Sequence, residues 1–372
     1  VEGKGLESGV AGVDADFKVE PYDNFGNRCT NEAELAGKLK AVLRHKTKAD
    51  IVIDATITLN NTSNADDVHY HAVYNCPVSG EYELEITMND ARIVDPVTTV
   101  LIKDAGVSDP KKTKSTLTCN STLIAGESLA VHIVAHDKHG NVRSSGGEKF
   151  LVELIDAKTN QLITNLETTD NNNGHYNVSH LLEKSGQYQV RVTLSGETVQ
   201  VHDFVVNDFG FTEPSQCITK LVTAQEDAQT SPVEDLKSVR AGASHLVLVQ
   251  VRDKFGNVRN QLNENERLVL VGVSKSKLEQ VLQAEVSFNG TRHGAEGYYV
   301  LPFELSESGD YALEVLLQDT ATEKATTLPN YPTEIHLIES GKTDVQRCKF
   351  KGDYEKTKGN EKGMLYDGFT RA

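Results

Sequence analysis

The sequence predicts an all-β protein made of antiparallel β-sandwiches that follow one another along the chain. The first observation is an alternating apolar run ending in Asp-x-x-Gly-Asn, which occurs three times, as FKVEPYDNFGN, VHIVAHDKHGN and VLVQVRDKFGN. The second is a Ser-Gly-x-Tyr segment that follows each of these turns. The third is the spacing, since the turn aspartates at 23, 137 and 253 recur with the length of a small domain. Separate domains are therefore expected, and not a solenoid.

Apolar side chains occupy every second position of each run, as the two faces of a β-strand require. In the first run, Phe17 and Val19 share one face, while Lys18 and Glu20 occupy the other. The later segments SGEYELEI, SGQYQVRV and SGDYALEV alternate in the same way. Many short strands separated by Gly, Asn and Asp turns, in units of about a hundred residues, favour antiparallel sandwiches of the immunoglobulin type.

The Asp-x-x-Gly-Asn segment is interpreted as a structural turn. Aspartate accepts backbone hydrogen bonds at the start of a turn, glycine tolerates a positive φ, and asparagine is the next best residue there. A calcium loop would need about six or seven oxygen ligands, and a phosphate loop would need more glycines and a helix start. The predicted turn residues are Asp23, Gly26, Asn27, Asp137, Gly140, Asn141, Asp253, Gly256 and Asn257.

The order of these motifs resembles the filamin-type repeat, also found in gelation factors, which is an immunoglobulin-like sandwich. In that resemblance an Asp-x-x-Gly-Asn turn precedes Gly-x-Tyr-x-Val and then Ser-Gly-x-Tyr-x-Leu-x-Val, and VEGKGLESGV resembles the family's first strand. The resemblance extends over nearly the whole chain. Two features depart from it: the usual Gly-Ser-Pro-Phe of the last strand is replaced, and no calponin-type actin-binding head is present. Actin binding is therefore not carried over to this segment.

The repeats divide the chain into four expected segments. These are a first repeat over 1–106, a second over 107–208, a third over 209–341 and the truncated start of a fourth over 342–372. Within the third, a polar insertion near 222–238 is expected to form a loop. The second repeat has the fewest extra residues.

A short helix is expected in the first repeat, near 31–43. Leu35, Leu39, Val42 and Leu43 have the spacing of one helical face, and Asn31 with Glu34 forms a candidate capping box ahead of them. The helix would lie beside the third strand and disturb that region. For this reason the partner-binding groove that the resemblance implies for the other repeats, described below, is not expected in the first repeat.

The composition excludes several function classes. A net charge of −16 and a pI near 5.2 argue against nucleic acid and against direct binding to an anionic membrane. No apolar run reaches the ~20 residues of a membrane span.

His132 and His136 lie about 13 Å apart along a strand, too far for one zinc ion. No Gly-x-Ser-x-Gly elbow occurs. We therefore expect neither an enzyme nor a bound metal or cofactor.

Cysteines and asparagines point to different compartments. Cys119, Cys217 and Cys348 occupy equivalent strands a domain apart and cannot pair, and Cys29 and Cys76 are expected at opposite ends of one sandwich. Five unpaired thiols favour a reducing cytosol. Five glycosylation sequons leave a cell-surface location open, although random placement alone would give about three. They are at Asn60, Asn61, Asn120, Asn177 and Asn289.

The resemblance implies that protein partners dock on the third strand of a repeat and add a strand to the sheet edge. The segments that match this edge are 149–155 and 267–273, and the candidate partner-binding residues are Phe150, Leu151, Val152, Glu153, Leu154, Leu268, Val269, Leu270 and Val271. The alternative interpretation is that they are simply core strands.

The first functional hypothesis is a non-catalytic cytoskeletal spacer or cross-linker in the cytoplasm that binds partner peptides. The alternative is an extracellular adhesion ectodomain, since filamin-type repeats also occur in surface proteins of gamete recognition. A third hypothesis is an accessory module of an enzyme whose catalytic domain lies elsewhere. The oligomeric state is left open.

Overall fold

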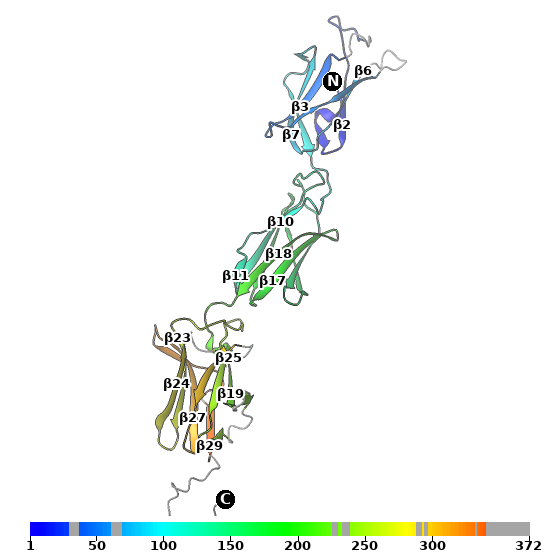
Figure 1. Ribbon diagram of the computed structural model, residues 1–372. Helices are drawn as coiled ribbons and strands as arrows, with labels where there is room; N and C mark the ends of the chain where they lie inside the picture. Colours follow the sequence, from blue (N-terminus) through cyan, green and yellow to red (C-terminus); the bar gives the residue numbers. More distant parts are fainter. Residues whose placement is uncertain are drawn as a thin grey trace, which may run out of the picture. The chain divides into compact units, whose positions relative to one another are not determined.

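The computed structural model describes residues 1–29, 37–60, 69–224, 230–232, 239–287, 292–293, 297–331 and 333–339. These residues form β-strands and two short 3-10 turns, Lys4–Leu6 (η1) and Pro214–Gln216 (η3), without an α-helix among them (Figure 1). In this described part, no helix has the length and apolar character needed to cross a bilayer. The predicted all-β, immunoglobulin-like repeat fold is confirmed.

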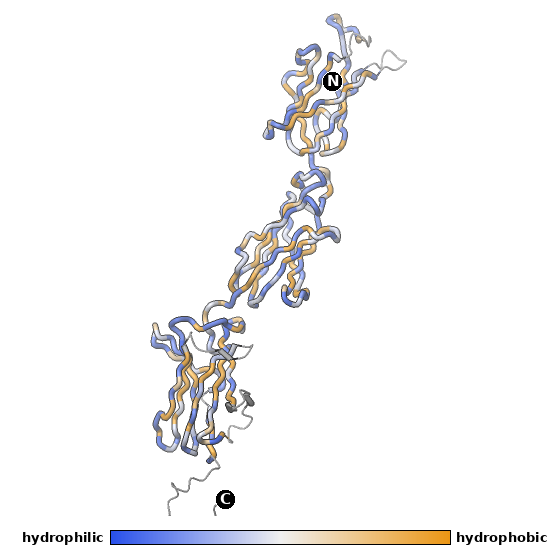
Figure 2. The backbone as a smooth tube through the Cα atoms, viewed as in Figure 1, coloured by the Kyte–Doolittle hydropathy of each residue, from blue (hydrophilic) through white to orange (hydrophobic). Residues whose placement is uncertain are grey.

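The chain divides into two compact units. The first comprises Val1–Ile218, Gln250–Glu266 and Arg292–Tyr298, and the second comprises Thr219–Val249, Arg267–Thr291 and Tyr299–Ala372. The strands form six sheets, which combine in pairs as three sandwiches. Figure 2 shows hydrophobic and hydrophilic residues interchanging along the strands of each sandwich, as expected where one face of a sheet is buried.

The described residues of the first sandwich form nine strands. One sheet has the order β1-β9-β7-β3-β4, with β8 paired to β7, and the other has the order β2-β6-β5. The strands are β1 (Ser8–Val10), β2 (Asp14–Val19), β3 (Leu39–His45), β4 (Val52–Asp54), β5 (Thr56–Asn60), β6 (His69–Asn75), β7 (Gly80–Met88), β8 (Ala91–Arg92) and β9 (Thr98–Lys103). Phe17 of β2 and Leu43 of β3 are fully buried in the shared core.

The helix expected near 31–43 is wrong for the residues that the structure describes. Residues 39–45 form β3, which pairs with β7 over its whole length. Leu39, Ala41 and Leu43 are buried in alternation with polar or half-buried neighbours, so the period-two pattern outweighs the helical spacing. Leu35 and the proposed capping residues lie outside the described part of the chain.

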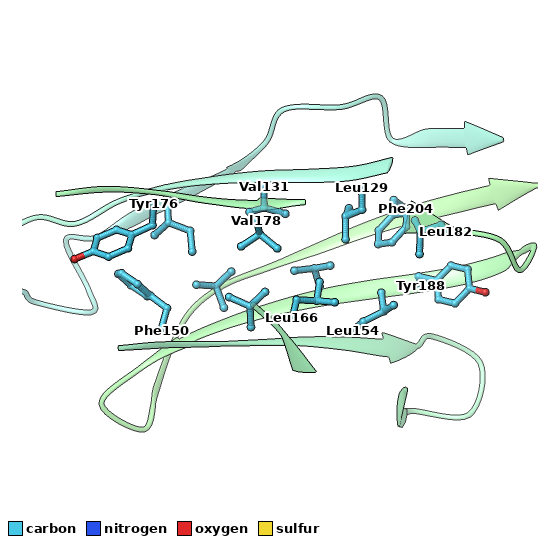
Figure 3. Close-up of a cluster of buried hydrophobic side chains, with 14 of the residues drawn as sticks. Leu129, Val131, Phe150, Leu154, Leu166, Tyr176, Val178, Leu182, Tyr188 and Phe204 are labelled. Atoms are coloured by element: carbon cyan, nitrogen blue, oxygen red, sulfur yellow. The ribbon is translucent and has the colours of Figure 1, made fainter. Parts of the chain in front are cut away.

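The second sandwich pairs a sheet of order β10-β12-β16-β15 with a sheet of order β11-β18-β17-β13-β14. Its strands are β10 (Lys114–Leu117), β11 (Thr122–Ile124), β12 (Glu127–Val134), β13 (Phe150–Asp156), β14 (Gln161–Leu166), β15 (Thr169–Asp170), β16 (His175–Leu182), β17 (Gly186–Leu194) and β18 (Glu197–Asn207). Figure 3 shows the core between the sheets, with Phe150 and Tyr176 at one end and Tyr188 at the other.

The third sandwich repeats this plan, with sheets of order β20-β19-β22-β26-β25 and β21-β29-β27-β23-β24, and with β28 paired to β27. Its strands are β19 (Ile218–Ala224), β20 (Thr230–Pro232), β21 (Val239–Arg240), β22 (His245–Gln250), β23 (Glu266–Ser274), β24 (Glu279–Ser287), β25 (Arg292–His293), β26 (Tyr298–Phe303), β27 (Gly309–Asp319), β28 (Lys324–Thr327) and β29 (Thr333–Ile338). Within the segment expected to be a loop near 222–238, residues 222–224 pair with 230–232, and the rest lies outside the described residues.

One tyrosine anchors the same turn in each sandwich. Its hydroxyl donates a hydrogen bond of 2.8 to 2.9 Å to the backbone carbonyl four residues earlier, while its ring lies in the core. This geometry fixes the turn that leads into the long strand β7, β17 or β27. The donor and acceptor pairs are Tyr82 with Val78, Tyr188 with Lys184, and Tyr311 with Glu307.

Candidate functional site

The three Asp-x-x-Gly-Asn turns share one set of internal hydrogen bonds. In the second turn, Oδ1 of Asp137 accepts from the backbone N–H groups of His139 and Asn141, and Oδ2 accepts from the Asn141 side chain, each at 2.9 Å. The glycine has a φ of +85° there, and +82° and +78° in the other copies. The equivalent bonds form at Asp23 and at Asp253. Each turn is therefore closed by its own residues.

The surroundings of the turns differ. Asp137 and Asp253 are 0% exposed, and Asn141 and Asn257 are 7% and 6% exposed. The equivalent Asp23 is exposed, although its local geometry is the same. Burial of the second and third turns therefore comes from groups outside the turn.

The second turn is buried by residues of the first sandwich. The side-chain amide of Asn141 donates a 2.8 Å hydrogen bond to the carbonyl of Pro77, and its Oδ1 accepts one of 2.9 Å from the N–H of Ser79. Oδ2 of Asp137 accepts from the N–H of Ala105, in the segment that connects β9 to β10. Asparagine suits this position because one amide supplies both a donor and an acceptor.

The third turn repeats these contacts with the second sandwich. Asn257 donates a 2.8 Å bond to the carbonyl of Glu183 and accepts one of 3.0 Å from the N–H of Ser185, while Asp253 accepts from the N–H of Phe209. All of these residues belong to the first compact unit. We call each such set of contacts around a turn a joint.

The residue in the middle of each buried turn packs on a glycine. A Cβ built on Gly12 would lie 2.0 Å from Nε2 of His139, and one built on Gly126 would lie 3.1 Å from the ring of Phe255. Both glycines have a positive φ. Phe255 also packs edge-on against Phe209, with ring centroids 6.0 Å apart. Only glycine leaves room for the incoming side chain at these positions.

A buried ion pair completes each joint. Arg143 pairs with Asp104, which lies just after β9, and both side chains are nearly fully buried. Arg259 pairs with Asp208, just after β18, at 3.2 Å and with Glu266 at 3.0 Å. Removing one partner of such a pair leaves a buried charge unpaired, which is strongly destabilising. The connecting segments are therefore held by side chains of the following sandwich.

Three of the joint carboxylates, Asp104, Asp137 and Asp253, have lowered pKa values. Burial is the largest influence on Asp137 and Asp253 and acts to raise the pKa. Hydrogen bonds from the asparagine side chain and from the backbone of the connecting segment and turn outweigh it, so the pKa of each carboxyl lies below its ordinary value. The pKa of Asp104 is also lowered, because bonds from Ser144 and Gly106 and the charge of Arg143 outweigh its burial. These carboxylates are thus stabilised as anions.

The candidate partner strands are not sheet edges, so that part of the prediction is wrong. Residues 150–154 lie in β13, which is hydrogen-bonded to β17 on one side and to β14 on the other. Residues 268–271 lie in β23, between β27 and β24. In both repeats the chain folds back after the third strand as an additional strand that covers the edge. From Val152 onward β13 is paired on both sides, as β23 is paired with β24 from Arg267 onward, so an incoming peptide would find these stretches already covered, whereas Phe150 and Leu151 are paired with β17 and not with β14.

On the side of the third strand, the sheet edges are β14 and β24, and the opposite edges are β11 and β21. Leu162 and Ile163 of β14 are 53% and 49% exposed, and Val281 of β24 is also exposed. Both hairpins contain a register shift, between Leu154 and Ile155 and between Gly272 and Val273. Such an irregularity twists the edge strand locally.

Three of the five sequon asparagines lie in the described residues. Asn60 at the end of β5, Asn120 before β11 and Asn177 on β16 are all exposed. Asn61 and Asn289 lie outside the described part of the chain. A glycan on any of the three would extend into solvent.

The described cysteines are free thiols: Cys29, Cys76, Cys119 and Cys217. Burial raises the pKa of Cys76 and of Cys217 to about 11. Cys348 lies outside the described residues. Of the histidines, His132 stacks on His175, with the ring nitrogens 3.1 Å apart. Within the described residues, no group of three metal-ligating side chains gathers around one point.

No single motif in the sequence predicts the joints. Two dipeptides recur in every repeat, however: Ala-Gly lies eleven residues before each turn aspartate, and Ser-Gly begins each long strand. The structure shows that the turn of one repeat contacts both dipeptide regions of another.

Paired antiparallel sheets, a tyrosine that anchors the same turn, and one turn repeated in series define a tandem immunoglobulin-like repeat protein. Comparison with protein families matches the Filamin/ABP280 repeat to residues 1–96 and 107–205, just over half of the chain. The chain belongs to the filamin repeat family, and the resemblance noted from its motifs is confirmed.

Three solved structures with similarity to the chain are bacterial proteins. FdeC, an adhesin of Escherichia coli, is 16% identical with a TM-score of 0.48, over 89% of this chain and 94% of its own. Invasin, a bacterial integrin-binding protein, is 11% identical with a TM-score of 0.40, over 89% and 58%. InvD of Yersinia pseudotuberculosis is 14% identical with a TM-score of 0.43, over 90% and 96%.

Proposed function

We propose that this chain is a non-catalytic spacer and protein-interaction scaffold. The observation that carries this proposal is the joint, which occurs twice with the same hydrogen bonds, the same aromatic or histidine contact to glycine, and a buried Asp–Arg pair. Such joints hold connecting segments that would otherwise be mobile. A scaffold of this kind transmits force and sets the separation of whatever its ends carry.

Stretching the whole chain between its two ends tests the spacer role. We expect separate unfolding steps, each with the contour length of one sandwich, because each sandwich has its own core. A chain that extends smoothly, without steps, would contradict the proposal.

For partner binding by strand addition, we propose β14 in place of β13. Its outer backbone groups lie at a sheet edge, and Leu162 and Ile163 supply exposed apolar side chains beside it. The change Ile163→Lys is expected to reduce recovery of a partner peptide selected on the second repeat. Val205→Lys is the matched control, since Val205 is 36% exposed and lies where β18 is paired with both β17 and β11. Equal losses in both variants would refute the β14 edge.

We propose a cell-surface adhesion protein as the second and more specific function. The exposure of Asn60, Asn120 and Asn177 supports it, and burial of Cys76 and Cys217 protects those thiols in an oxidising compartment. The pairing of β14 with β13 also weakens the cytoskeletal hypothesis, because its partner-binding part relied on β13 as an open edge. Glycopeptide mass spectrometry of the protein from its native cells tests the compartment. Unmodified asparagine at all three positions would favour the cytoplasmic spacer.

A further inference from the structure

Two histidines of the second sandwich meet across neighbouring strands of one sheet. Nε2 of His132, on β12, lies 3.1 Å from Nδ1 of His175, on β16. The rings are nearly parallel, with centroids 5.2 Å apart and 12° between their planes. Both side chains are half-buried on the outer face of the sheet. Spacing along a single strand does not reveal the pair, because the antiparallel register places His132 opposite Asn177 and therefore diagonal to His175.

The sandwich fold does not require histidine at these two positions. The turn aspartates and the strand registers align His132 with one residue of each other repeat, and His175 with another. The equivalent residues are Lys18 and His69 in the first repeat, and Leu248 and Tyr298 in the third. The histidine pair is therefore a property of the second repeat and not of the fold.

The protons of the pair are free to rearrange. A hydrogen bond between two neutral imidazoles uses one ring nitrogen as donor and the other as acceptor. In the described part of the chain, no hydrogen bond fixes a proton on Nδ1 of His132 or on Nε2 of His175. Each ring can carry its proton on that outer nitrogen, so that the lone pairs of the two inner nitrogens face each other. His136 differs, because its Nδ1 donates to the carbonyl of Val134 at 2.9 Å.

The separation of the inner nitrogens fits two ligands of one metal ion. With metal–nitrogen bonds of about 2.0–2.1 Å, two ligand nitrogens lie about 2.9 Å apart at a right angle and about 3.4 Å apart at a tetrahedral angle. The observed 3.1 Å falls between these values. The χ2 torsion of histidine is broad, so both rings can turn their lone pairs toward a shared ion without movement of the strands.

The outward positions of β12 and β16 hold no carboxylate. They are Ser128, Ala130, His132 and Val134 on β12, and His175, Asn177, Ser179 and Leu181 on β16. Ca²⁺ and Mg²⁺ bind through several oxygen ligands, carboxylates above all. Imidazole nitrogen suits Ni²⁺, Cu²⁺ and Zn²⁺ instead. This face therefore selects against the hard cations.

We propose that His132 and His175 form a binding site for one divalent transition-metal ion of the Ni²⁺, Cu²⁺ and Zn²⁺ group. The two imidazoles hold the ion, and water fills the remaining positions, as in sites that stay open to an external ligand. Among these ions, Cu²⁺ binds most tightly. Lys114 of β10 lies opposite Val134, and its positive charge limits the affinity. The site goes beyond the scaffold role and does not depend on the compartment.

Calorimetric titration of the metal-free full chain with nickel chloride tests the site. His132→Lys, which takes the residue of the first repeat at this position, and His175→Asn should each weaken binding about tenfold or more, because the second imidazole no longer binds at the high effective concentration of a neighbour. His136→Asn is the matched control and should leave the affinity unchanged. An equal loss in His136→Asn, or an unchanged affinity in both pair variants, would overturn the proposal.

Histidine ring NMR locates the ion independently. Ni²⁺ is paramagnetic, so a substoichiometric amount is expected to broaden the ring signals of His132 and His175 first, and that of the exposed His139 only at higher metal concentration. Zn²⁺ should shift the same two signals, whereas Mg²⁺ should not. Both pair variants should retain the wild-type circular dichroism, since the replaced rings lie on the outer face. Earlier broadening at another histidine would refute the site.

Discussion

The N–H of Ser185 lies 3.0 Å from Oδ1 of Asn257, so a side chain of the third repeat satisfies the backbone of a turn in the second. The same relationship, at 2.9 Å, joins Ser79 to Asn141. An asparagine that sequence analysis assigns to its own turn thus has a second task in the neighbouring repeat. The two tasks can be separated by experiment.

Replacement of the joint asparagine should be more costly than replacement of its exposed counterpart. Asn257→Asp removes the donor to the carbonyl of Glu183 and brings a carboxylate to Asp253, so we expect a loss of about 1–3 kcal/mol in the free energy of unfolding. Asn27→Asp is the control, with a smaller loss because Asn27 is exposed. Urea denaturation measures both. Equal losses would show that only the internal bonds of the turn matter.

Tyr188 should stabilise the second sandwich in two separable ways. Tyr188→Ala removes a buried ring that stacks on Phe204 and should cost about 3–5 kcal/mol, enough to unfold this sandwich selectively. Tyr188→Phe removes only the bond to the carbonyl of Lys184 and should cost about 1 kcal/mol. Calorimetry of the full chain separates the transitions. The prediction fails if Tyr188→Ala lowers every transition equally.

Acid should weaken the joints. The pKa values of Asp104, Asp137 and Asp253 are lowered in the folded chain, so these groups stabilise it above their unfolded pKa of about 3.9. That contribution is lost as the pH falls below this value and through the folded pKa, because protonation then favours the unfolded chain. Denaturation midpoints recorded from pH 6 downward should therefore fall most steeply below about pH 4.

Asp137→Asn is the matched variant for this pH dependence. It should be less stable at pH 7, because it loses the anion that accepts bonds from Ala105 and Asn141. It should also lose less stability on acidification than the wild-type chain. A wild-type chain that becomes more stable between pH 4 and pH 3 would contradict the assignment.

The thiols should differ in reactivity. Burial raises the pKa of Cys217 to about 11, so only a small fraction of it is thiolate at pH 8, and its side chain is nearly inaccessible. Cys119 is partly exposed and should react with iodoacetamide sooner. Peptide mapping after timed labelling measures both rates. Denaturation should make all the thiols reactive at similar rates, which serves as the control.

Local patterns in the sequence were sufficient to predict the strands and the family. Alternation at Phe17 and Val19 reports burial on one sheet face, and it needs no knowledge of distant residues. The helix near 31–43 was wrong because Leu39 and Leu43 fit a helical spacing together with Val42 and an alternating pattern together with Ala41. Only pairing of β3 with β7 decides between them.

The joints and the true sheet edges could not be predicted, because they depend on contacts between residues that are far apart in the sequence. Residues 149–155 were expected to form an edge because the resemblance implies docking on the third strand. The exposed Leu162 and Ile163 in the following segment do not show that this segment pairs with β13. The partner of Asn141 lies 62 residues away at Ser79 and cannot be inferred from spacing alone. The repeat boundaries and the partner strands therefore remain predictions.

The Asp104–Arg143 pair determines where the second repeat can be excised. Asp104 belongs to the first repeat by sequence, yet its carboxylate neutralises an arginine enclosed by the second. A fragment that starts at Val107 would retain Arg143 and discard its closest counter-ion, leaving only the longer 3.6 Å pair with Glu148. Starting at Lys103 keeps the pair together, so the shortest self-sufficient piece of this protein overlaps its predecessor by a few residues. Neighbouring repeats therefore share buried residues: the second repeat needs Asp104, which the sequence assigns to the first.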